Sequence, residues 1–539
     1  MAVPYHVGQT LPLSLDPHYL PRYALFTFLR MSVALLFSLL FTFVFATWAA
    51  KSRRAEQIII PCIDIFQSLP VIAILSITIV GFIKLFPGSL LGPECAAVFA
   101  IFTSQVWNMA LSFYQSLCTV PKELKEAAKM FHLSAWQRFW RIEVPFATPG
   151  LLWNMMMSMS ASWFFLTVSE SVTVADQTIT LPGLGSYIAL AIKHADLHAV
   201  GYVILAMLVV ILIYDQLLFR PLIHWAEKFR VESESSGETS FSLFNFILHK
   251  TRLMQYVGLL WEKTSDLFVN VRFLRQSPES SARAIKKKRE SFLSQCLWKI
   301  FVGLLLAGSL GVLAWFIFTT LSLSIFFHAV VLGAITGLRV LTVLIVSSLI
   351  WVPVGVWIGL RPRVAEKAQP IVQLLASFPA NLLFPIVVSL IVRFHLNVEI
   401  WVTPLMILGT QWYILFNVIA GASAIPKDLK QAVDNFGLKG WLWWRKLILP
   451  AIFPYYVTGA ITAAGGAWNT SIVAEVASWG DTTLRATGLG AYITKYAQQG
   501  NFPFIVLGMS VMCFYVLILN RFVWRRLYLL AMRRYSLTL

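Results

Sequence analysis

The sequence predicts an all-α, polytopic transmembrane protein with eleven spans, built from two parallel five-span repeats joined by one extra span. Hydrophobic residues make up 58% of its 539 residues and charged residues only 13%, a balance that excludes disorder and is unusual for a soluble protein. Apolar runs of about 20 residues, long enough to cross a bilayer as helices, recur along the chain. Rare residues also recur at a nearly constant spacing, which indicates a duplication.

The candidate spans begin with a run that is too long for the core of a signal peptide, so we expect it to be retained in the protein. The eleven runs cover roughly 23–49, 57–83, 95–118, 147–170, 198–219, 298–320, 331–359, 370–392, 398–421, 451–476 and 501–520. Pro70 and Pro379 lie inside two of these runs, and we expect each proline to kink its span.

An internal repeat relates the two halves of the chain. Adding 305 to a residue number in the first half reaches the same residue type in the second, and earlier in each half the spacing is 309. The pairs at 305 are Pro121 and Pro426, Pro145 and Pro450, Trp107 and Trp412, Trp163 and Trp468, Glu170 and Glu475, and Asp176 and Asp481; those at 309 are Arg30 and Arg339, Pro61 and Pro370, and Pro70 and Pro379.

The repeat divides the chain into five segments. We predict an outer N-terminal tail (1–22), a first repeat (23–230), a cytoplasmic linker (231–297), an extra connecting span (298–320) and a second repeat (331–539). Because each repeat has an odd number of spans, a direct fusion would invert the second repeat, and the extra span restores a parallel orientation.

The positive charges orient the spans. Lys and Arg collect in the cytoplasmic loops of membrane proteins, and the stretch 220–297 carries 13 Lys and Arg against 8 Asp and Glu. We therefore predict that the N-terminus lies outside and the C-terminus inside. The same rule accounts for the formal net charge of +18, so we expect the lipid bilayer, and no nucleic acid, as the partner of these residues.

The sequence shows no catalytic or metal-binding constellation. The cysteines lie in or beside apolar runs, without a C-x-x-C pair or clustered histidines, so we predict neither disulfides nor a metal site. A membrane-embedded enzyme would need such a cluster of reactive groups. The other alternative, a secondary transporter with parallel repeats, would place carboxylates or histidines near the middle of the membrane, and the predicted spans contain very few.

Two basic segments, 122–145 and 427–450, contain an amphipathic helix between spans. The apolar stripe consists of Leu124, Ala128 and Phe131 in the first segment and of Leu429, Val433 and Phe436 in the second. One interpretation is a helix that lies on lipid headgroups. The small residues Ala127, Ala432 and Gly437 favour the other interpretation, in which another protein approaches the helix closely.

Both segments resemble the EAA loop of ATP-binding-cassette importer permeases, in which Glu-Ala-Ala is followed by Gly and later by Ile-x-Leu-Pro. The matching or replaced positions are Glu126, Ala127, Ala128, His132 and Pro145 in the first segment and Gln431, Ala432, Gly437 and Pro450 in the second. His132 stands in place of the glycine and Gln431 in place of the glutamate. The stretches 415–437, 473–476 and 488–493 resemble the nitrate, sulfonate, taurine and bicarbonate branch of this family.

This resemblance implies a duplicated and fused pair of type I importer permease repeats in a bacterial inner (plasma) membrane. It implies that the two amphipathic helices are coupling helices that dock in a cytoplasmic ATPase dimer. ATP would be bound by that partner, because this chain has no G-x-x-x-x-G-K-[ST] phosphate loop, and we expect no cofactor on the chain itself. A periplasmic or lipoprotein solute-binding protein would deliver the cargo, a small oxoanion-like solute.

Charged residues inside the predicted spans are candidates for the translocation pathway or its gate, because a charge in the bilayer is costly. Arg30 and Arg339 either snorkel to headgroups or line the path of an anion. We expect a gating or hydrogen-bonding role for Glu170 and Glu475, because an acid repels an anion. The GLG turns that follow, with Gly183 and Gly185 in the first repeat and Gly488 and Gly490 in the second, either form plain turns or frame the outer gate.

Overall fold

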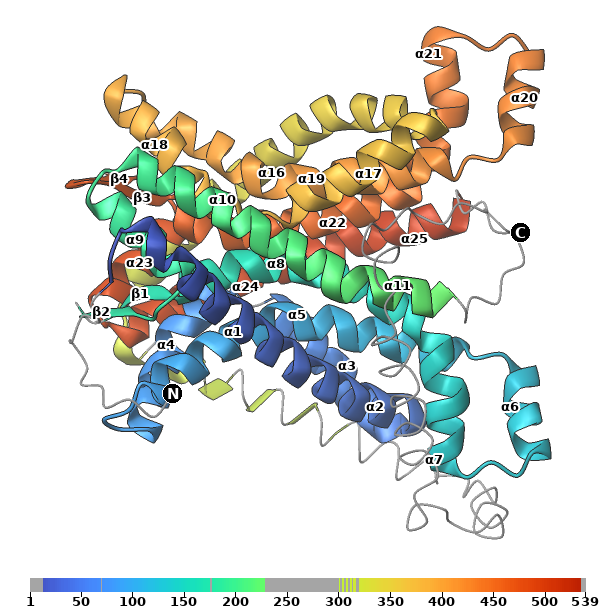
Figure 1. Ribbon diagram of the computed structural model, residues 1–539, viewed down its shortest axis with the longest axis horizontal. Helices are drawn as coiled ribbons and strands as arrows, with labels where there is room; N and C mark the ends of the chain where they lie inside the picture. The colour runs from blue at the N-terminus through green and yellow to red at the C-terminus, as the bar shows by residue number, and fades with distance from the viewer. Residues whose placement is uncertain are drawn as a thin grey trace.

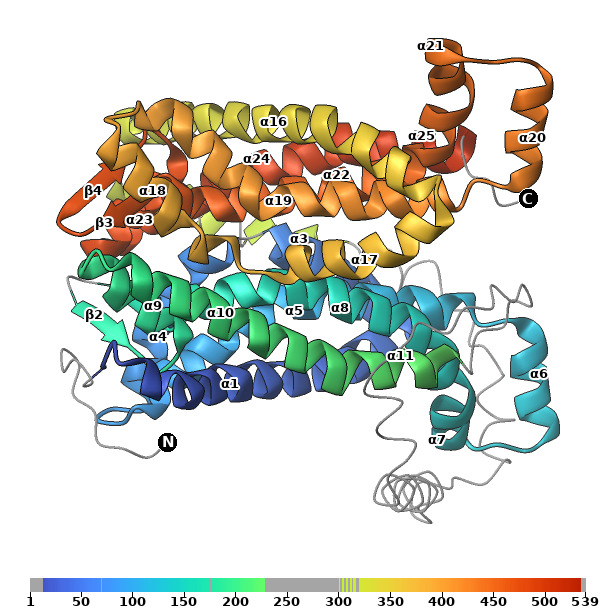
Figure 2. The ribbon, with the colours of Figure 1, turned by 45° about the horizontal axis from the view of Figure 1, so that its top comes forward.

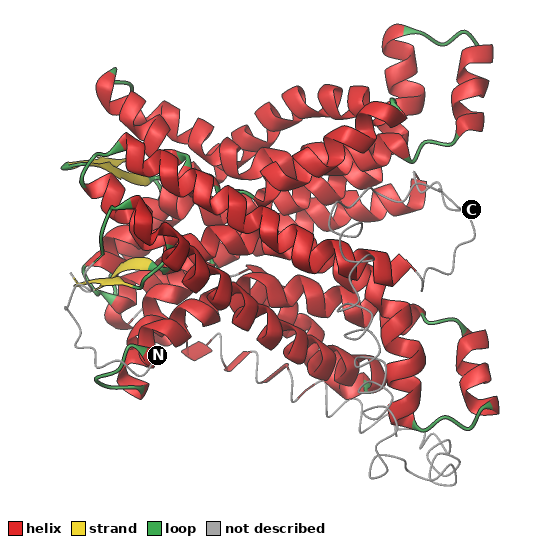
Figure 3. Cartoon of the chain, viewed as in Figure 1, coloured by secondary structure: helices red, strands yellow, loops and turns green. Residues whose placement is uncertain are grey.

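The computed structural model describes residues 13–68, 70–174, 177–227 and 321–534, together with parts of 300–320. Long helices run side by side along the longest axis of the molecule, and the first repeat (blue to green) lies beside the second (yellow to red) (Figure 1, Figure 2). Two short strand hairpins lie at one end of the bundle (Figure 3). Two helical loops protrude from the other end. We call these the hairpin end and the loop end.

The first repeat consists of helices and one antiparallel hairpin, in which Ser171 pairs with Thr180. Its helices are α1 (Leu20–Phe41), α2 (Thr47–Lys51), α3 (Arg53–Ser68), α4 (Val71–Leu85), α5 (Leu91–Thr119), α6 (Lys122–Met130), α7 (Ala135–Arg138), α8 (Val144–Ser169), α9 (Leu184–Lys193), α10 (Leu197–Tyr214) and α11 (Arg220–Glu227). Its strands are β1 (Ser171–Val174) and β2 (Gln177–Thr180).

The second repeat has the same order of elements. Its helices are α16 (Leu323–Gly359), α17 (Pro362–Ser377), α18 (Phe384–Arg393), α19 (Val398–Ser423), α20 (Lys427–Asn435), α21 (Gly440–Trp443), α22 (Leu449–Ala474), α23 (Leu489–Gln498), α24 (Phe502–Leu519) and α25 (Arg525–Arg534), and its strands are β3 (Val476–Trp479) and β4 (Thr482–Arg485). From α6 and α20 onward, equivalent elements begin 305 residues apart. The repeat in the sequence is therefore a repeat of structure.

Ten of the eleven predicted spans correspond to helices, or bent pairs of helices, that are long and apolar enough to cross a membrane. The predicted extra span at 298–320 lies largely outside the described residues, as does the linker at 231–297. Both helical loops lie at the same end of the bundle (Figure 1), so the two repeats are parallel, as predicted. The placement of the N-terminus outside the cell stays a prediction.

The runs at 57–83 and 370–392 are not single spans with a kink. In the second repeat the chain bends by 73° between Pro362–Ser377 and the helical stretch that starts at Ala380, and Pro379 stands at the break. In the first repeat α3 ends at Ser68 and α4 starts at Val71, directly after Pro70. Proline lacks the N–H of a helical turn and disfavours helical geometry in the preceding residue, so each run is divided into two helices.

The two strand hairpins were not predicted. Each follows the helix that comes after a helical loop, and each strand is short. The strands of the first repeat are rich in β-branched residues, SVTV at 171–174 and QTIT at 177–180. Such residues favour strands. Antiparallel strands of four residues are too short to dominate a hydropathy pattern, which explains why the apolar runs concealed them.

Side chains in the middle of the bundle join the two repeats. The backbone N–H of Val71 donates to Oδ1 of Asn469 at 3.1 Å, although the two residues belong to different repeats. The amide of Asn381 donates to the hydroxyl of Thr167 at 2.8 Å. These polar contacts lie between helices that also line the central cavity described below.

Candidate functional site

The helical loop of each repeat consists of a nine-residue helix and a short connection back to the bundle. Helices α6 and α20 project beyond the ends of the spans (Figure 1, Figure 2). Ala128 is buried, whereas Phe131 is 76% exposed and its equivalent Phe436 is 80% exposed. Exposed phenylalanines at matching positions give each loop an apolar contact surface.

Other motif positions take similar places in the two loops. Glu126 and Gln431 are exposed, and Ala127 and Ala432 are half-buried. The loop surface therefore presents a polar residue and a small residue next to the exposed phenylalanine. These positions match the predicted docking residues, and their role in coupling stays a prediction.

The glycine of the motif serves the backbone. Gly437 has a φ of +64°, and no atom lies within 4 Å of the place where a Cβ would stand. Its equivalent His132 has a φ of +49°, a left-handed conformation that glycine adopts freely and histidine more often than most other residues. Leu133 N–H donates to the carbonyl of Ala128 at 3.0 Å, the hydrogen bond of a Schellman cap. The positive φ gives Gly437 a role as a helix cap, and its role as a small docking residue stays a prediction.

Each loop is continuous with a helix of the bundle. Residues Ala135–Ser169 and Gly440–Ala474 are two unbroken helical stretches of 35 residues. Pro145 and Pro450 lie inside them, each two positions after the end of a five-residue π-helical turn. A proline removes one backbone donor, and a local π-helical adjustment is one way in which a helix accommodates such a break. Each loop is thus joined to the middle of the bundle by one continuous helix.

At the hairpin end of the first repeat, four side chains form what we call the first clamp: Thr27, Arg30, Glu94 and Glu170. Arg30 donates from Nε and Nη2 to the two carboxylate oxygens of Glu94, at 2.6 and 2.7 Å. Its Nη1 donates to Oε1 of Glu170 at 2.7 Å and to the carbonyl of Pro182 at 2.8 Å. Such bidentate pairs are the strongest geometry available to arginine.

The first clamp also holds the start of α9. Thr27 donates to Oε1 of Glu170 at 2.8 Å and accepts from the N–H of Leu184 at 3.0 Å. The N–H of Gly185 donates to Oε2 of Glu170 at 2.6 Å. Helices α1, α5, α8 and α9 therefore meet at one buried carboxylate.

The second clamp consists of the equivalents Thr336, Arg339, Glu399 and Glu475. Arg339 donates to Oε1 of Glu475 at 3.0 Å and also pairs with Glu399. Thr336 donates to Oε1 of Glu475 at 2.8 Å. The two clamps differ at one position, because the Glu94 side chain is 10% exposed and the Glu399 side chain is 44% exposed.

The glycines of the GLG turns make room for the clamps. A Cβ on Gly183 would lie 2.3 Å from the carboxylate of Glu170, and a Cβ on Gly488 would lie 2.2 Å from that of Glu475. A Cβ on Gly185 or Gly490 would meet a backbone carbonyl at 2.1 or 2.5 Å. The backbone does not require glycine at Gly183 and Gly488, because their φ angles of 177° and −177° are extended.

The clamps change the interpretation of the two arginines. Arg30 and Arg339 are buried and ion-paired, so neither snorkels to headgroups. Neither belongs to the described lining of the central cavity, so the geometry gives no support to a cationic lining of the path. The hydrogen-bonding role expected of Glu170 and Glu475 agrees with the contacts above.

Sequence reasoning overlooked half of each clamp. Glu94 and Glu399 are 305 residues apart, and Thr27 and Thr336 are 309 apart. Applying the two repeat spacings to every polar residue would have found both pairs. They were missed because the two glutamates lie at the very start of their helices, where a carboxylate is unremarkable.

A cavity of about 260 Å³ lies between the two repeats. Both repeats contribute amide and hydroxyl groups to its lining, among them Gln67, Asn108 and Asn154 from the first repeat and Asn417, Thr462 and Asn469 from the second. None of the described residues that line it carries a charge. Across the part of the chain that the structure describes, no group of three or more His, Cys, Asp or Glu side chains is arranged to hold a metal ion.

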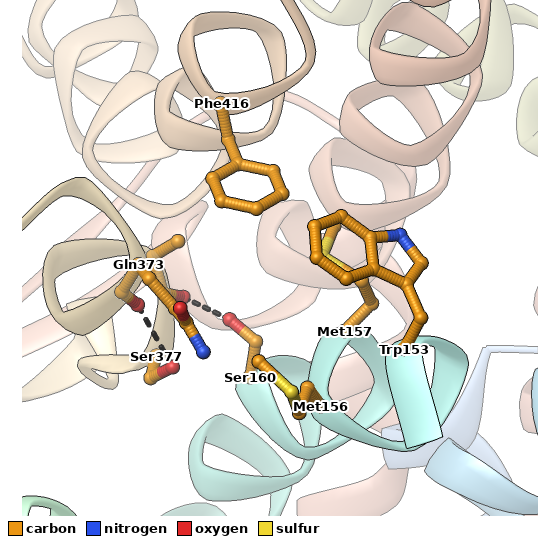
Figure 4. Close-up of a pocket in the computed structure, with 8 residues that line it drawn as sticks. Trp153, Met156, Met157, Ser160, Gln373, Ser377 and Phe416 are labelled. Carbon is orange, nitrogen blue, oxygen red and sulfur yellow. Dashed lines mark hydrogen bonds between the residues drawn. The ribbon is translucent and has the colours of Figure 1, made fainter. Parts of the chain in front are cut away.

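A narrow pocket adjoins the cavity where α8 meets α17 and α19 (Figure 4). The rings of Trp153 and Phe416 stack there, with centroids 5.4 Å apart. The hydroxyl of Ser160 donates to the carbonyl of Ala376. Both aromatic residues lie in the loop-end halves of their helices, so the two repeats touch on the loop-end side of the cavity.

Two parallel membrane repeats that enclose an uncharged polar cavity and carry duplicated loops at one end define a transport permease. The chain belongs to the family of binding-protein-dependent transport system inner membrane components, whose model matches residues 38–219 and 352–533, one segment in each repeat. Members of this family are inner membrane components of binding-protein-dependent transport systems, and the relatives are named as transport permease proteins.

Three relatives illustrate the range of this family. The bicarbonate transport system permease protein CmpB of Synechococcus elongatus is 28% identical over 178 residues, which are 33% of this chain and 61% of the relative. The nitrate import permease protein NrtB of Leptolyngbya laminosa is 25% identical over 185 residues, 34% of this chain and 63% of the relative. The glycine betaine/carnitine transport permease protein GbuB of Listeria monocytogenes is 29% identical over 172 residues, 32% and 55% respectively. Each alignment covers less than two thirds of the relative.

Proposed function

We propose that this chain forms the translocation pathway of an ATP-driven importer for a small oxoanion-like solute, and that a separate ATPase dimer docks on its two helical loops. The observation that carries the proposal is the pairing of a polar cavity between the repeats with two matching loops at one end of the bundle. One loop per repeat supplies one docking site for each subunit of a dimer.

Exposed aromatic residues on the loops support docking on a protein. Helices α6 and α20 lie beyond the ends of the spans and run across the direction of the spans (Figure 2), an orientation that an interfacial helix shares, so the support comes from the exposed side chains. The exposed Phe131 and Phe436 are aromatic anchors of the kind that dominate protein interfaces. In this proposal ATP is bound by the partner, and closure of the ATPase moves the helices that are continuous with the loops.

The hairpin end is the proposed docking face of the solute-binding protein. It lies opposite the loop end (Figure 1), so a solute released there would reach the cavity from the side away from the ATPase. The clamps fix the starts of α9 and α23 at this end, which gives the binding protein a rigid surface.

The oxoanion assignment is supported by the relatives that carry bicarbonate and nitrate in their names and by hydroxyl and amide groups in the cavity. Neutral donors of this kind stabilise an oxoanion without trapping it, since a permeating solute must bind weakly enough to leave. The absence of carboxylates among the described lining residues also removes a repulsion that an anion would meet.

The test is uptake of labelled nitrate and bicarbonate into vesicles that contain the chain, its ATPase and its binding protein. We expect uptake that requires ATP inside the vesicles and that stops when Phe131→Ala and Phe436→Ala are combined. Uptake that continues without ATP and follows a proton gradient would instead identify a secondary transporter. Uptake of neither anion, with ATP-driven uptake of another solute, would overturn the oxoanion assignment alone.

A further inference from the structure

The cavity is lined differently by the two equivalent helices α8 and α22. On α8 the lining includes Trp153, Met157, Phe164 and Phe165, which we call the apolar wall. Adding 305 to these numbers gives Thr458, Thr462, Asn469 and Thr470 on α22, which we call the polar wall. Each bulky side chain of the first repeat is thus replaced, at the same place on the same helix face, by a smaller polar side chain.

Two glycines enlarge the cavity on the side of the polar wall. Gly465 and Gly466 take the places of Ser160 and Ala161. No atom lies within 4 Å of a Cβ built on Gly465, so the space beside it is open. Glycine in a helix interior lowers stability by roughly 0.5–1 kcal/mol relative to alanine. A need for open space beside the helix would explain why glycine stands here.

A buried hydroxyl points to a ligand in this space. Ser158 lines the cavity and is only 1% exposed, and its hydroxyl has no hydrogen-bond partner among the described residues. Buried hydroxyls are normally satisfied. The hydroxyls of Thr458 and Thr462 donate to carbonyls of their own helix, each at 3.1 Å, and each O–H can rotate away from its carbonyl to donate to an oxoanion.

The size of the cavity exceeds what a bare inorganic oxoanion needs. A cavity of about 150 Å³ in another protein holds a benzene molecule, and the cavity here is about 260 Å³. Nitrate and bicarbonate are smaller than benzene and have no apolar part to place against Trp153 and Phe164.

We propose that the cavity is a binding station for an organic solute with a polar, oxoanion-like end and an apolar body of up to ring size. The body lies against the apolar wall of α8, and the polar end is bound by Ser158 and by the polar wall of α22. This inference rests on the proposed function, since it names the class of solute that takes the same pathway.

Equilibrium binding to the full chain in lipid nanodiscs, measured by titration calorimetry, tests the solute class without the ATPase. The probes are benzenesulfonate, methanesulfonate, nitrate and glycine betaine. We expect benzenesulfonate to bind roughly tenfold more tightly than methanesulfonate or nitrate, because the apolar wall buries its ring. Equal affinities for benzenesulfonate and nitrate would overturn the proposal, and a preference for glycine betaine, whose body is a cationic trimethylammonium group, would overturn the assignment of an uncharged apolar body.

Three variants locate the site. Trp153→Ala should remove most of the preference for benzenesulfonate over methanesulfonate, and Thr462→Val should weaken both sulfonates alike. Gly465→Leu should abolish binding of benzenesulfonate by filling the open space. The matched control is Gly201→Leu, because Gly201 lies on the exposed face of α10 and also has no atom within 4 Å of a built Cβ. Unchanged binding in Gly465→Leu places the site elsewhere and refutes the proposal.

The two levels of inference fail separately. If vesicles show ATP-driven uptake of nitrate but the chain shows no preference among the probes, the proposed function stands and the organic class is wrong. If benzenesulfonate binds as expected but no solute is taken up with ATP, the binding station exists and the proposed function is wrong.

Discussion

Arg30 of the first repeat and Arg339 of the second lie at matching places of the hairpin end, and each forms ion pairs with two glutamates. One glutamate of each pair also accepts a hydrogen bond from a threonine. Trp153 and Thr458 also occupy matching places, beside the cavity, but they share no chemistry. Each repeat holds its own helices together with a clamp, and the two clamps have kept the same residues. The cavity is shared by both repeats, holds one solute at a time in our proposal, and has two different walls.

This difference separates two kinds of constraint. A clamp must hold α1, α5, α8 and α9 together in the first repeat and their equivalents in the second, so the same buried ion pairs serve both. A binding station needs complementary walls and gains nothing from symmetry, because a solute with two unlike ends is not symmetric. The residues that line the cavity were therefore free to diverge between the two repeats, whereas those at the hairpin end and the loop end of the bundle were not.

The largest effect is expected from breaking the first clamp. Arg30→Gln leaves two buried carboxylates, Glu94 and Glu170, without a cation, and removing one partner of a buried pair costs about 3–5 kcal/mol. Arg339→Gln should cost somewhat less, because it leaves only Glu475 buried without a cation, whereas solvent reaches the half-exposed Glu399. Thermal unfolding of the two variants in nanodiscs measures the difference. Equal losses of stability would show that the exposure of Glu399 is irrelevant and that the clamps are alike.

The next effect concerns the walls. Thr458→Trp places a second large ring at the site that is equivalent to Trp153, and we expect uptake to fall roughly tenfold while the thermal midpoint changes little, because the ring enters open cavity space. Trp153→Thr should keep uptake and broaden the range of solutes. The measurement is uptake in vesicles at equal expression. If Thr458→Trp transports normally, the walls are not part of the path.

The smallest effect is expected at the caps of the two loops. His132→Gly relieves a left-handed residue at φ +49° and should stabilise the end of α6 by about 1 kcal/mol. Gly437→His should destabilise the end of α20 by a similar amount. Hydrogen exchange of the amides that follow each helix measures both changes. Slower exchange after Gly437→His would contradict the cap interpretation.

The features that could be predicted from the sequence are those that depend on residues close together, or regularly spaced, along the chain. The parallel repeats, the spans and the helical loops are local or periodic features, so the apolar runs and the spacings of 305 and 309 were enough to predict them. Glu94 was missed because its importance comes from Arg30, which is 64 residues away in the chain and lies on another helix. The left-handed backbone angle of Gly437 is not revealed by the motif alone.

The cavity could not be predicted for a related reason. Its lining combines Val71 of the first repeat with Asn469 of the second, and no pattern within one repeat indicates which face of a buried helix meets the other repeat. Comparing α8 and α22 residue by residue at a spacing of 305 would have shown where the two repeats diverge, but not that the divergent residues share a cavity.

The central claim is that the two repeats are equivalent at the hairpin end and the loop end of the bundle. The apolar wall of α8 and the polar wall of α22, which line the cavity, are not equivalent. ATP-driven uptake in vesicles tests it most directly, with benzenesulfonate and nitrate as competing solutes and two matched pairs of variants. Phe131→Ala and Phe436→Ala should lower uptake of both solutes to a similar extent, because each loop holds one ATPase subunit. Trp153→Ala and Thr458→Ala should act differently from one another, the first removing the preference for benzenesulfonate and the second preserving it. Unequal effects within the phenylalanine pair, together with equal effects within the wall pair, would contradict the account.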